Sequence, residues 1–361
     1  MTTINEDEQI RREISMDIQR QMLDLYMGFV RALPVLSSLQ ETKYKTTPHD
    51  VVYEEDQVKL LHYKPIAKRL HKTPILIVYA LVNRHYILDV ETRSAIRNLL
   101  NQGFDVYLID WGTAGSKERL LAIDDYVNGY IDRCVDVVRD QSNSDKVSLF
   151  GYCMGGTFST IYTALHKEKV RNLITLAPSI DCSKDTTVFA SLARFLDIDN
   201  FVDTLGNIPP AFQYIFFMML KPFKHYVEKY NQVSEKIEDK EFVDDFLKLE
   251  KWLWDTPPIP GEVFRQWVKD IYQENLLIQN RLQIGGRLVD LRRIDVPLLT
   301  IIAESDHLVS PESSKALNYA VHSKDKTLML FPTGHIGLCA SSYSQIKVWP
   351  KVGEWLMERS D

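Results

Sequence analysis

The sequence predicts an α/β fold with a doubly wound, mostly parallel sheet and an inserted helical segment. Short, continuously apolar runs alternate with helical patterns over residues 74–176. Strands that are covered on both faces of a parallel sheet are apolar at every position, so this alternation is typical of such a sheet. A helical, aromatic and proline-punctuated segment, residues 181–290, interrupts the alternation, which resumes over 296–331.

Each element follows from its local pattern. Continuous or alternating apolar residues predict strands at 51–53, 58–63, 74–80, 104–110, 146–150, 172–176, 296–303 and 327–331. Apolar residues at helical spacing predict helices at 90–102, 124–141, 153–166 and 345–359. We expect residues 41–180 and 291–361 to form the α/β core, and residues 181–290 to form a helical cap with no strand signal.

Residues 1–40 form a separate, amphipathic helical segment in this prediction, with a helix over 8–33. Its apolar residues recur at spacings of three and four, which gives one apolar stripe. The stripe consists of Ile10, Ile14, Ile18, Met22, Leu25 and Phe29. It either packs on the protein's own core or docks on another subunit, and both interpretations stay open.

Composition excludes several classes of protein. The chain has 361 residues, 45% of them hydrophobic, and a net charge of −6, which disfavours a nucleic-acid binder. The longest membrane-span candidate, 208–220, is broken by Pro209, Pro210 and Gln213, and the N-terminus has no signal-peptide core. The four cysteines show no zinc-ligand spacing. We therefore expect a cytoplasmic protein with reduced thiols and without a metal or cofactor.

The segment KVSLFGYCMGGT, residues 146–157, predicts a nucleophile elbow. It has the order strand, G-x-C-x-G-G, helix, and small residues on both sides of the nucleophile allow the tight turn. Cys153 stands where the motif places its nucleophile, and the positive end of the following helix favours a thiolate. The Met154 amide is then one oxyanion donor. The alternative is a buried, inert cysteine at a tight turn.

The acid and the base follow in the order of the α/β-hydrolase fold, which is nucleophile, acid, histidine. Asp306 lies just after the predicted strand 296–303, and His335 lies in a glycine-containing loop after the strand 327–331. Glu304 is an alternative acid, and His307 is a weaker candidate for the base.

The loop after the strand 74–80 should supply the second oxyanion amide, near Val82 or Asn83, with Val82 preferred. His85 lies in this loop, and its role stays open. Residues 110–112 end the next strand and are either a site element or an ordinary strand-end turn.

Several of these segments resemble polyhydroxyalkanoate synthase catalytic subunits of the short, two-component type, class III or class IV. The resembling runs are ILIVYALVNRHYILDV, FDVYLIDWGT, LFGYCMGGT, GNIPP, IPGEVFRQW, AESDHLV and PTGHIG, from about residue 45 to the end. The resemblance implies an acyltransferase that polymerises (R)-3-hydroxyacyl-CoA into a polyester, with Cys153, Asp306 and His335 as its catalytic set. It also implies a cap, homodimerisation, a second synthase subunit and association with polyester granules.

The resemblance further implies that Asp306 helps to activate the 3-hydroxyl of the incoming unit. Two rival functions remain at this point: a cysteine hydrolase of the dienelactone-hydrolase type, and a non-catalytic granule scaffold on an inactive hydrolase fold. A small-lactone hydrolase does not need the long segment 181–290, and a scaffold does not need the intact order of Cys153, Asp306 and His335.

Overall fold

The computed structural model describes residues 44–68, 70–91, 93–220 and 229–360, with scattered positions between 16 and 42. The chain divides into two compact units. The larger consists of Lys45–Phe212 and Asp255–Asp361, and the smaller of Met1–Tyr44 and Gln213–Trp254. The helix expected over 8–33 was predicted from six apolar residues that all lie outside the described residues, so that prediction stays open.

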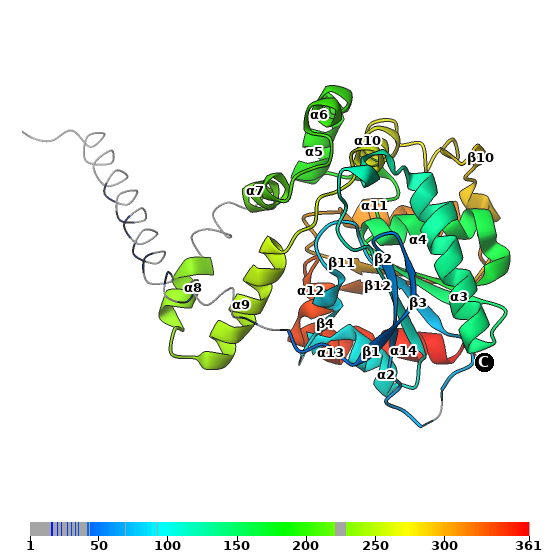
Figure 1. Cartoon of the computed structure of the whole chain (residues 1–361), viewed down its shortest axis with the longest axis horizontal. Coiled ribbons are helices and arrows are strands. Elements are labelled where there is room, and N and C mark those ends of the chain that lie inside the picture. The colour runs from blue at the N-terminus through cyan, green and yellow to red at the C-terminus, as the bar shows by residue number, and fades with distance from the viewer. Residues whose placement is uncertain are drawn as a thin grey trace, which may run out of the picture. The chain divides into compact units, whose positions relative to one another are not determined.

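Eight strands form one sheet in the larger unit, in the order β1-β2-β6-β3-β7-β8-β11-β12 (Figure 1). Strand β2 is antiparallel to both of its neighbours, and the other pairs are parallel. The strands are β1 (His49–Glu55), β2 (Val58–Tyr63), β3 (Ile75–Val78), β6 (Val106–Asp110), β7 (Val147–Tyr152), β8 (Val170–Leu176), β11 (Leu298–Ala303) and β12 (Lys326–Phe331). All eight predicted strands are confirmed.

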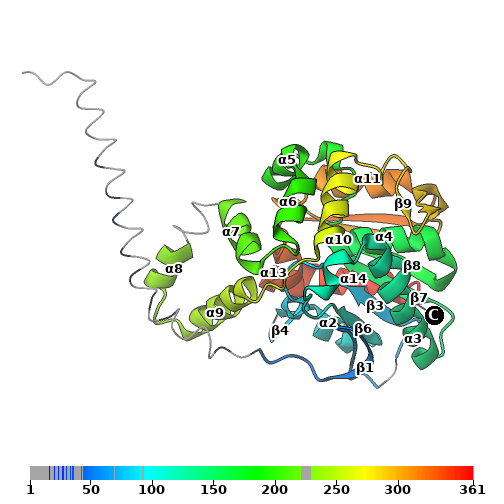
Figure 2. The same ribbon diagram turned by 45° about the horizontal axis from the view of Figure 1, so that its top comes forward.

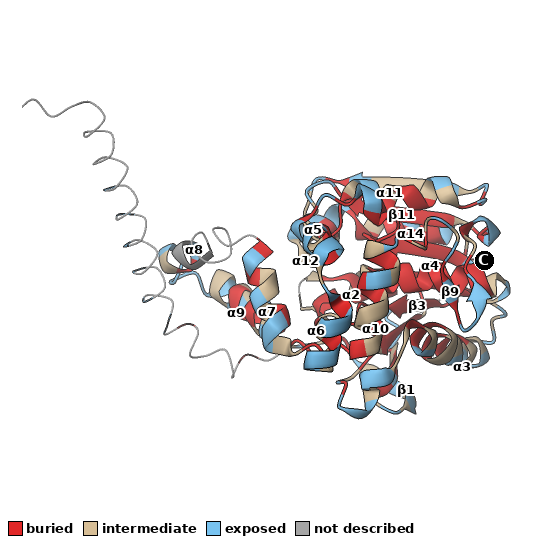
Figure 3. Ribbon diagram, turned by 90° about the horizontal axis from the view of Figure 1, so that it is seen from above, coloured by how far each residue is buried: buried red, intermediate tan, exposed pale blue. Residues whose placement is uncertain are grey.

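Burial explains why the central strands were predictable. Strands β3, β7 and β11 are buried at every position, whereas the edge strands β1 and β12 are mostly exposed or half-buried. In Figure 3 the buried residues concentrate in β3, β11 and the helix labelled α4. A continuously apolar run is therefore a central strand here, as expected for a parallel sheet.

Helices of the larger unit connect these strands. Helix α4 packs on β3, β7 and β8, and α14 packs on α2 (Figure 1). The helices are α2 (Ala95–Asn101), η4 (Asp125–Ile131), α3 (Asp132–Ser142), α4 (Met154–His166), α5 (Val188–Phe195), α6 (Ile198–Leu205), α10 (Gly261–Gln266), η8 (Trp267–Gln273), α11 (Pro311–Ala320), α12 (Gly337–Ala340), α13 (Ser342–Lys347) and α14 (Trp349–Met357).

Two predicted helices differ in their bounds for local reasons. The helix expected at 90–102 begins only at Ala95, because Ser94 caps it by accepting a hydrogen bond from the Arg97 amide at 2.8 Å. The residues before it form the short strands β4 (Asp89–Val90) and β5 (Arg93–Ser94). The last helix is split into α13 and α14, because Pro350 cannot donate the hydrogen bond that would continue α13.

The segment 181–290 is mainly helical among its described residues, and helices α6 and α10 within it pack together (Figure 2). The expectation that it contains no strand was wrong. Strands β9 (Gln283–Ile284) and β10 (Arg287–Leu288) form a hairpin whose turn, Gly285 and Gly286, has φ values of 56° and 71°. A Gly-Gly pair between short apolar runs is a hairpin signal, and this signal was available in the sequence.

The smaller unit contains α8 (Lys229–Glu235), α9 (Lys240–Trp254) and most of α7 (Pro210–Leu220). Its buried cluster consists of Val35, Val233, Phe246 and Leu247. The predicted segment 181–290 therefore belongs to two different units. Residues 181–212 and 255–290 belong to the larger unit, which contains the sheet, and residues 213–254 belong to the smaller one. The role of 181–290 as a cap stays a prediction. Within the described parts of the chain, no helix combines the length and apolarity needed to span a bilayer.

Candidate active site

The predicted elbow forms between β7 and α4. Cys153 has φ 55° and ψ −122°, a left-handed conformation that is unfavourable for a residue with a side chain. The turn is held by hydrogen bonds from the Cys153 amide to the Leu176 carbonyl (2.8 Å) and from the Gly156 amide to the Cys153 carbonyl (2.9 Å). The backbone thus keeps Cys153 at the carboxyl edge of the sheet.

The glycines of the elbow are required by close packing. A Cβ on Gly151 would lie 2.4 Å from the Gly155 carbonyl oxygen, and one on Gly155 would lie 2.1 Å from the Val78 carbonyl oxygen. A Cβ on Gly156 would meet its nearest neighbours at 3.1 Å, which is less severe. The start of α4 therefore packs directly against the end of β3.

The acid and the base come from neighbouring strands. Strands β11 and β12 are parallel, with Ala303 opposite Phe331, so the loops that follow them begin at the same edge of the sheet. His335 Nδ1 lies 2.7 Å from Asp306 Oδ2. The other carboxylate oxygen, Oδ1, accepts hydrogen bonds from the amides of Leu308 (2.8 Å) and Val309 (3.0 Å).

These contacts distinguish the two candidate acids. Both Asp306 and His335 are almost completely buried, with 1% and 4% of their side chains exposed. Glu304 is exposed, and its amide bonds to the Phe331 carbonyl as part of the strand end. The structure therefore brings Asp306 to His335, as the sequence predicted, and leaves Glu304 at the surface.

The electrostatics link His335 to both partners. Burial disfavours its charged form, but the Asp306 carboxylate and the charge and hydrogen bond of Cys153 outweigh burial and raise the pKa of His335 to about 10. Burial also opposes ionisation of Asp306, yet His335 and the two loop amides hold the pKa of this carboxyl below its usual value. These interactions together favour the charged form of His335 over its neutral form.

Tyr152 is a contributor that sequence reasoning missed. Its ring stacks on the His335 ring at a centroid distance of 5.2 Å, and its hydroxyl donates to the His335 carbonyl at 3.3 Å. Tyr152, the residue before Cys153, therefore helps to hold the His335 ring in place. The only signal in the sequence was its position next to Cys153.

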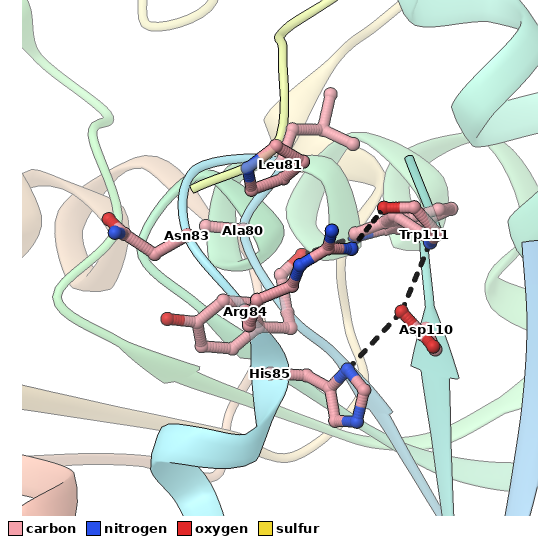
Figure 4. Close-up of a pocket in the computed structure, with 10 residues that line it drawn as sticks. Ala80, Leu81, Asn83, Arg84, His85, Asp110 and Trp111 are labelled. Carbon is pink, nitrogen blue, oxygen red and sulfur yellow. Dashed lines mark hydrogen bonds and ion pairs between the residues drawn. The ribbon is translucent and has the colours of Figure 1, made fainter. Parts of the chain in front are cut away.

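The loop after β3, residues 81–86, is called the β3 loop below. Strand β3 pairs with β7 in parallel, with Val78 opposite Gly151, so this loop begins beside the elbow. Figure 4 shows two of its links to the end of β6: the Arg84 guanidinium donates to the Gly112 carbonyl at 2.6 Å, and His85 Nδ1 lies 3.3 Å from Asp110 Oδ1. The end of β6 therefore holds the β3 loop.

The two oxyanion candidates occupy different settings. Met154 begins α4, and the first amides of a helix have no acceptor within it. Val82 is half-buried in the β3 loop. The structure thus places both candidates on segments that flank the end of β3.

Accessibility singles out one thiol. All four cysteines lie in the described part of the chain, and Cys134, Cys182 and Cys339 are buried, whereas Cys153 is partly exposed. Burial raises the pKa of the Cys134 and Cys339 thiols to about 12. Among the described residues, no group of three or more His, Cys, Asp and Glu side chains could hold a metal ion.

Comparison with known proteins identifies the fold of this chain. The family model "alpha/beta hydrolase fold" matches residues 73–339, and the model "Poly-beta-hydroxybutyrate polymerase (PhaC) N-terminus" matches residues 41–99. A monoacylglycerol lipase structure from Paleococcus ferrophilus has a TM-score of 0.53 and 18% identity, covering 84% of this chain and 100% of that one. At this identity the likeness shows the fold alone.

Two relatives are much more similar in sequence. The "Poly(3-hydroxyalkanoate) polymerase subunit PhaC" of Allochromatium vinosum is 43% identical over 345 residues, which is 95% of this chain and 97% of the relative. The protein of the same name from Haloferax mediterranei is 42% identical, over 96% of this chain and 72% of the relative. The chain therefore belongs to the poly(3-hydroxyalkanoate) polymerase subunit PhaC family and has an α/β-hydrolase fold.

Proposed function

We propose that this chain polymerises (R)-3-hydroxyacyl-CoA, with 3-hydroxybutyryl-CoA as its main substrate, into a polyester through an acyl intermediate on Cys153. The observation that carries the proposal is the Asp306–His335 pair next to an accessible Cys153, in a family of poly(3-hydroxyalkanoate) polymerases. The CoA thioester is the substrate, and the reaction we propose needs no cofactor.

Acylation begins when Cys153 Sγ attacks the thioester carbonyl carbon, after its proton has passed to His335. A C–S bond to Cys153 forms, the bond to CoA breaks, and His335 returns the proton to the leaving CoA thiolate. The amides of Met154 and Val82 would stabilise the negative oxygen. Exchange between two thioesters costs almost no free energy, which makes a cysteine more suitable than a serine for this reversible transfer.

Elongation uses the same groups. The 3-hydroxyl oxygen of an incoming unit attacks the acyl carbon, a C–O bond forms, and the C–S bond to Cys153 breaks. The hydroxyl proton passes to His335 and then to Cys153 Sγ. The lengthened acyl-CoA then acylates Cys153 again with release of CoA.

Asp306 acts through His335 in this proposal. Its side chain is 1% exposed, and both of its oxygens already accept hydrogen bonds, from His335 and from two loop amides. A direct contact with the incoming hydroxyl, as the family resemblance implies, would require Asp306 to give up one of these bonds. The Asp306→Asn experiment in the Discussion distinguishes the two roles.

We further propose that a second subunit supports this activity, because the relatives carry the word "subunit" in their names. Homodimerisation, cytoplasmic location at polyester granules and a covering role for residues 181–290 are part of the same proposal. A cover over Cys153 would exclude water and so protect the acyl-enzyme from hydrolysis.

The test is to incubate the purified chain with (R)-3-hydroxybutyryl-CoA and to measure CoA release, polymer and free acid together. We expect CoA release with polymer, and loss of both in Cys153→Ala. Cys134→Ala is the matched control, because it also removes a thiol but lies buried on α3, so its activity should equal that of the wild type.

The rival functions give different results in this assay. Stoichiometric CoA and free acid without polymer would identify a cysteine hydrolase. Absence of CoA release, with and without candidate second subunits, would identify a non-catalytic protein. Either result would overturn the proposal.

A further inference from the structure

Residues 213–254, called the insertion in this subsection, leave the larger unit after Phe212 and return to it at Asp255. Hydrogen bonds within the larger unit join the two segments of chain on either side of the insertion. Ile208 and Ile259 form an isolated antiparallel bridge, with N–H···O distances of 2.8 and 3.2 Å. The Gly261 amide adds a hydrogen bond to Asn207 Oδ1 at 3.2 Å. The segments of chain that lead into the insertion and out of it are therefore tied to each other inside the larger unit.

The segment that leads out, residues 255–257, is also tied to the β3 loop. The Asn83 Nδ2 donates to Thr256 Oγ1 at 2.6 Å, in a buried setting. The Tyr86 hydroxyl donates to Asp255 Oδ2 at 2.9 Å, and Arg84 Nε lies 3.5 Å from Asp255 Oδ1. Three side chains of the β3 loop, those of Asn83, Arg84 and Tyr86, thus contact two neighbouring residues, Asp255 and Thr256.

Asn83 is the centre of this arrangement. It has φ 60°, in the left-handed region that asparagine tolerates better than most residues, and it is 7% exposed. It directly follows Val82, whose amide is the proposed oxyanion donor. Because a buried side-chain amide needs its acceptor, the bond to Thr256 favours one conformation of the loop at this point.

We infer that residues 255–257 position the β3 loop, and with it the Val82 amide, for the reaction. The inference rests on the proposed function. The end of β6 holds one side of the loop, through Gly112 and Asp110, and residues 255–257 hold the other.

The main test variant is Thr256→Val, which keeps the shape of the side chain but removes the acceptor for Asn83. Removal of one oxyanion donor lowers kcat by about 10²–10³-fold, so a displaced donor should lower it by roughly tenfold. We expect this loss in kcat with KM almost unchanged. Hydrogen exchange of peptides that cover residues 80–87 should become faster.

A second variant and a control make the result specific. Tyr86→Phe removes one exposed hydroxyl of the same arrangement, so it should fold normally and shift kcat and loop exchange in the same direction by a smaller factor. Thr327→Val is the matched control. It also removes a hydroxyl that accepts from a side-chain N–H, that of Trp355 at 2.9 Å, but it lies on the edge strand β12. It should lower the melting temperature without changing kcat or exchange at 80–87.

Unchanged kcat and unchanged exchange in both Thr256→Val and Tyr86→Phe would overturn the inference. Equal effects from the Thr327→Val control would do the same, because they would show a general loss of stability. If Thr256→Val does not fold, Tyr86→Phe decides alone. Failure of the proposed function would look different, since the wild type itself would then form no polymer, while the hydrogen-exchange comparison between the variants would still be readable.

Discussion

The elbow and the β3 loop lie beside each other at the sheet edge, but different interactions hold them. The elbow is fixed by backbone packing, since a Cβ on Gly155 would lie 2.1 Å from the Val78 carbonyl oxygen. The β3 loop is held by side chains, among them Arg84 to Gly112 and Asn83 to Thr256. The nucleophile therefore has one rigid position, whereas the proposed oxyanion amide of Val82 depends on contacts that can be adjusted.

The largest expected effect comes from a substitution that disrupts the close backbone packing of the elbow. Gly155→Ala places a Cβ against two backbone carbonyls, and backbone can move little, so we expect a loss of about 3 kcal/mol or more in the free energy of unfolding. Gly156→Ala meets its neighbours only at 3.1 Å and should cost about 1 kcal/mol. Denaturant unfolding of both variants measures the difference. Equal stabilities would show that close packing does not define the elbow.

The next largest effect concerns the Asp306–His335 pair. Asp306→Asn removes the carboxylate that raises the pKa of His335 to about 10, while burial, which lowers this pKa, remains. The alkaline limb of the pH profile of acylation should therefore move from near pH 10 to lower pH. The rate should fall by about two to four orders of magnitude.

Single-turnover acylation and steady-state elongation should fall together in Asp306→Asn, because Asp306 acts through His335 in both. Acylation that is spared while elongation is lost would favour the direct contact between Asp306 and the incoming hydroxyl. An alkaline limb at the wild-type pH would contradict the assigned coupling between Asp306 and His335.

The smallest expected effect comes from weakening the contact between His85 of the β3 loop and Asp110 at the end of β6. Burial opposes ionisation of Asp110, but the hydrogen bond and charge of His85 lower its pKa to about 2, so the carboxylate is present at neutral pH. Asp110→Asn removes the charge and keeps the size. A hydrogen bond between this carboxylate and His85 contributes about 0.5–1 kcal/mol, so kcat should fall by about two- to fivefold.

A second histidine–aspartate pair provides the control for this variant. His62 Nε2 lies 2.7 Å from Asp105 Oδ1, just before the opposite end of β6, and the two pairs are similarly exposed. Asp105→Asn should leave kcat at the wild-type value. If both variants lower kcat equally, the effect reports the stability of β6 and not the position of the β3 loop.

The same difference explains what the sequence could predict. The elbow depends on glycines and a cysteine at fixed spacing, so Cys153 and Met154 could be located from a local pattern. Asp306 could be located because it follows the buried, apolar strand β11, and His335 because it follows the next predicted strand, β12, in the order that this fold requires. The sheet was predictable for the same reason, since burial on both faces makes each central strand apolar throughout.

The remaining features depend on contacts between distant residues. The hydrogen bond between Asn83 and Thr256 joins residues 173 positions apart, and no periodicity or motif indicates it. The stacking of Tyr152 on His335 is of the same kind. The β9–β10 hairpin is different, because its Gly285-Gly286 turn carried a local signal that the helical interpretation of 181–290 overrode. The division of the chain into two units likewise arises from long-range contacts.

In the proposed reaction, Cys153 carries the growing acyl chain. The most direct measurement is mass spectrometry of peptides from the wild-type chain, quenched in acid shortly after mixing with (R)-3-hydroxybutyryl-CoA. We expect one or more 3-hydroxybutyryl units on the peptide that contains Cys153, and their absence in His335→Gln. Acyl units on a different residue, or a Cys153 peptide that stays unmodified while polymer forms, would contradict this expectation.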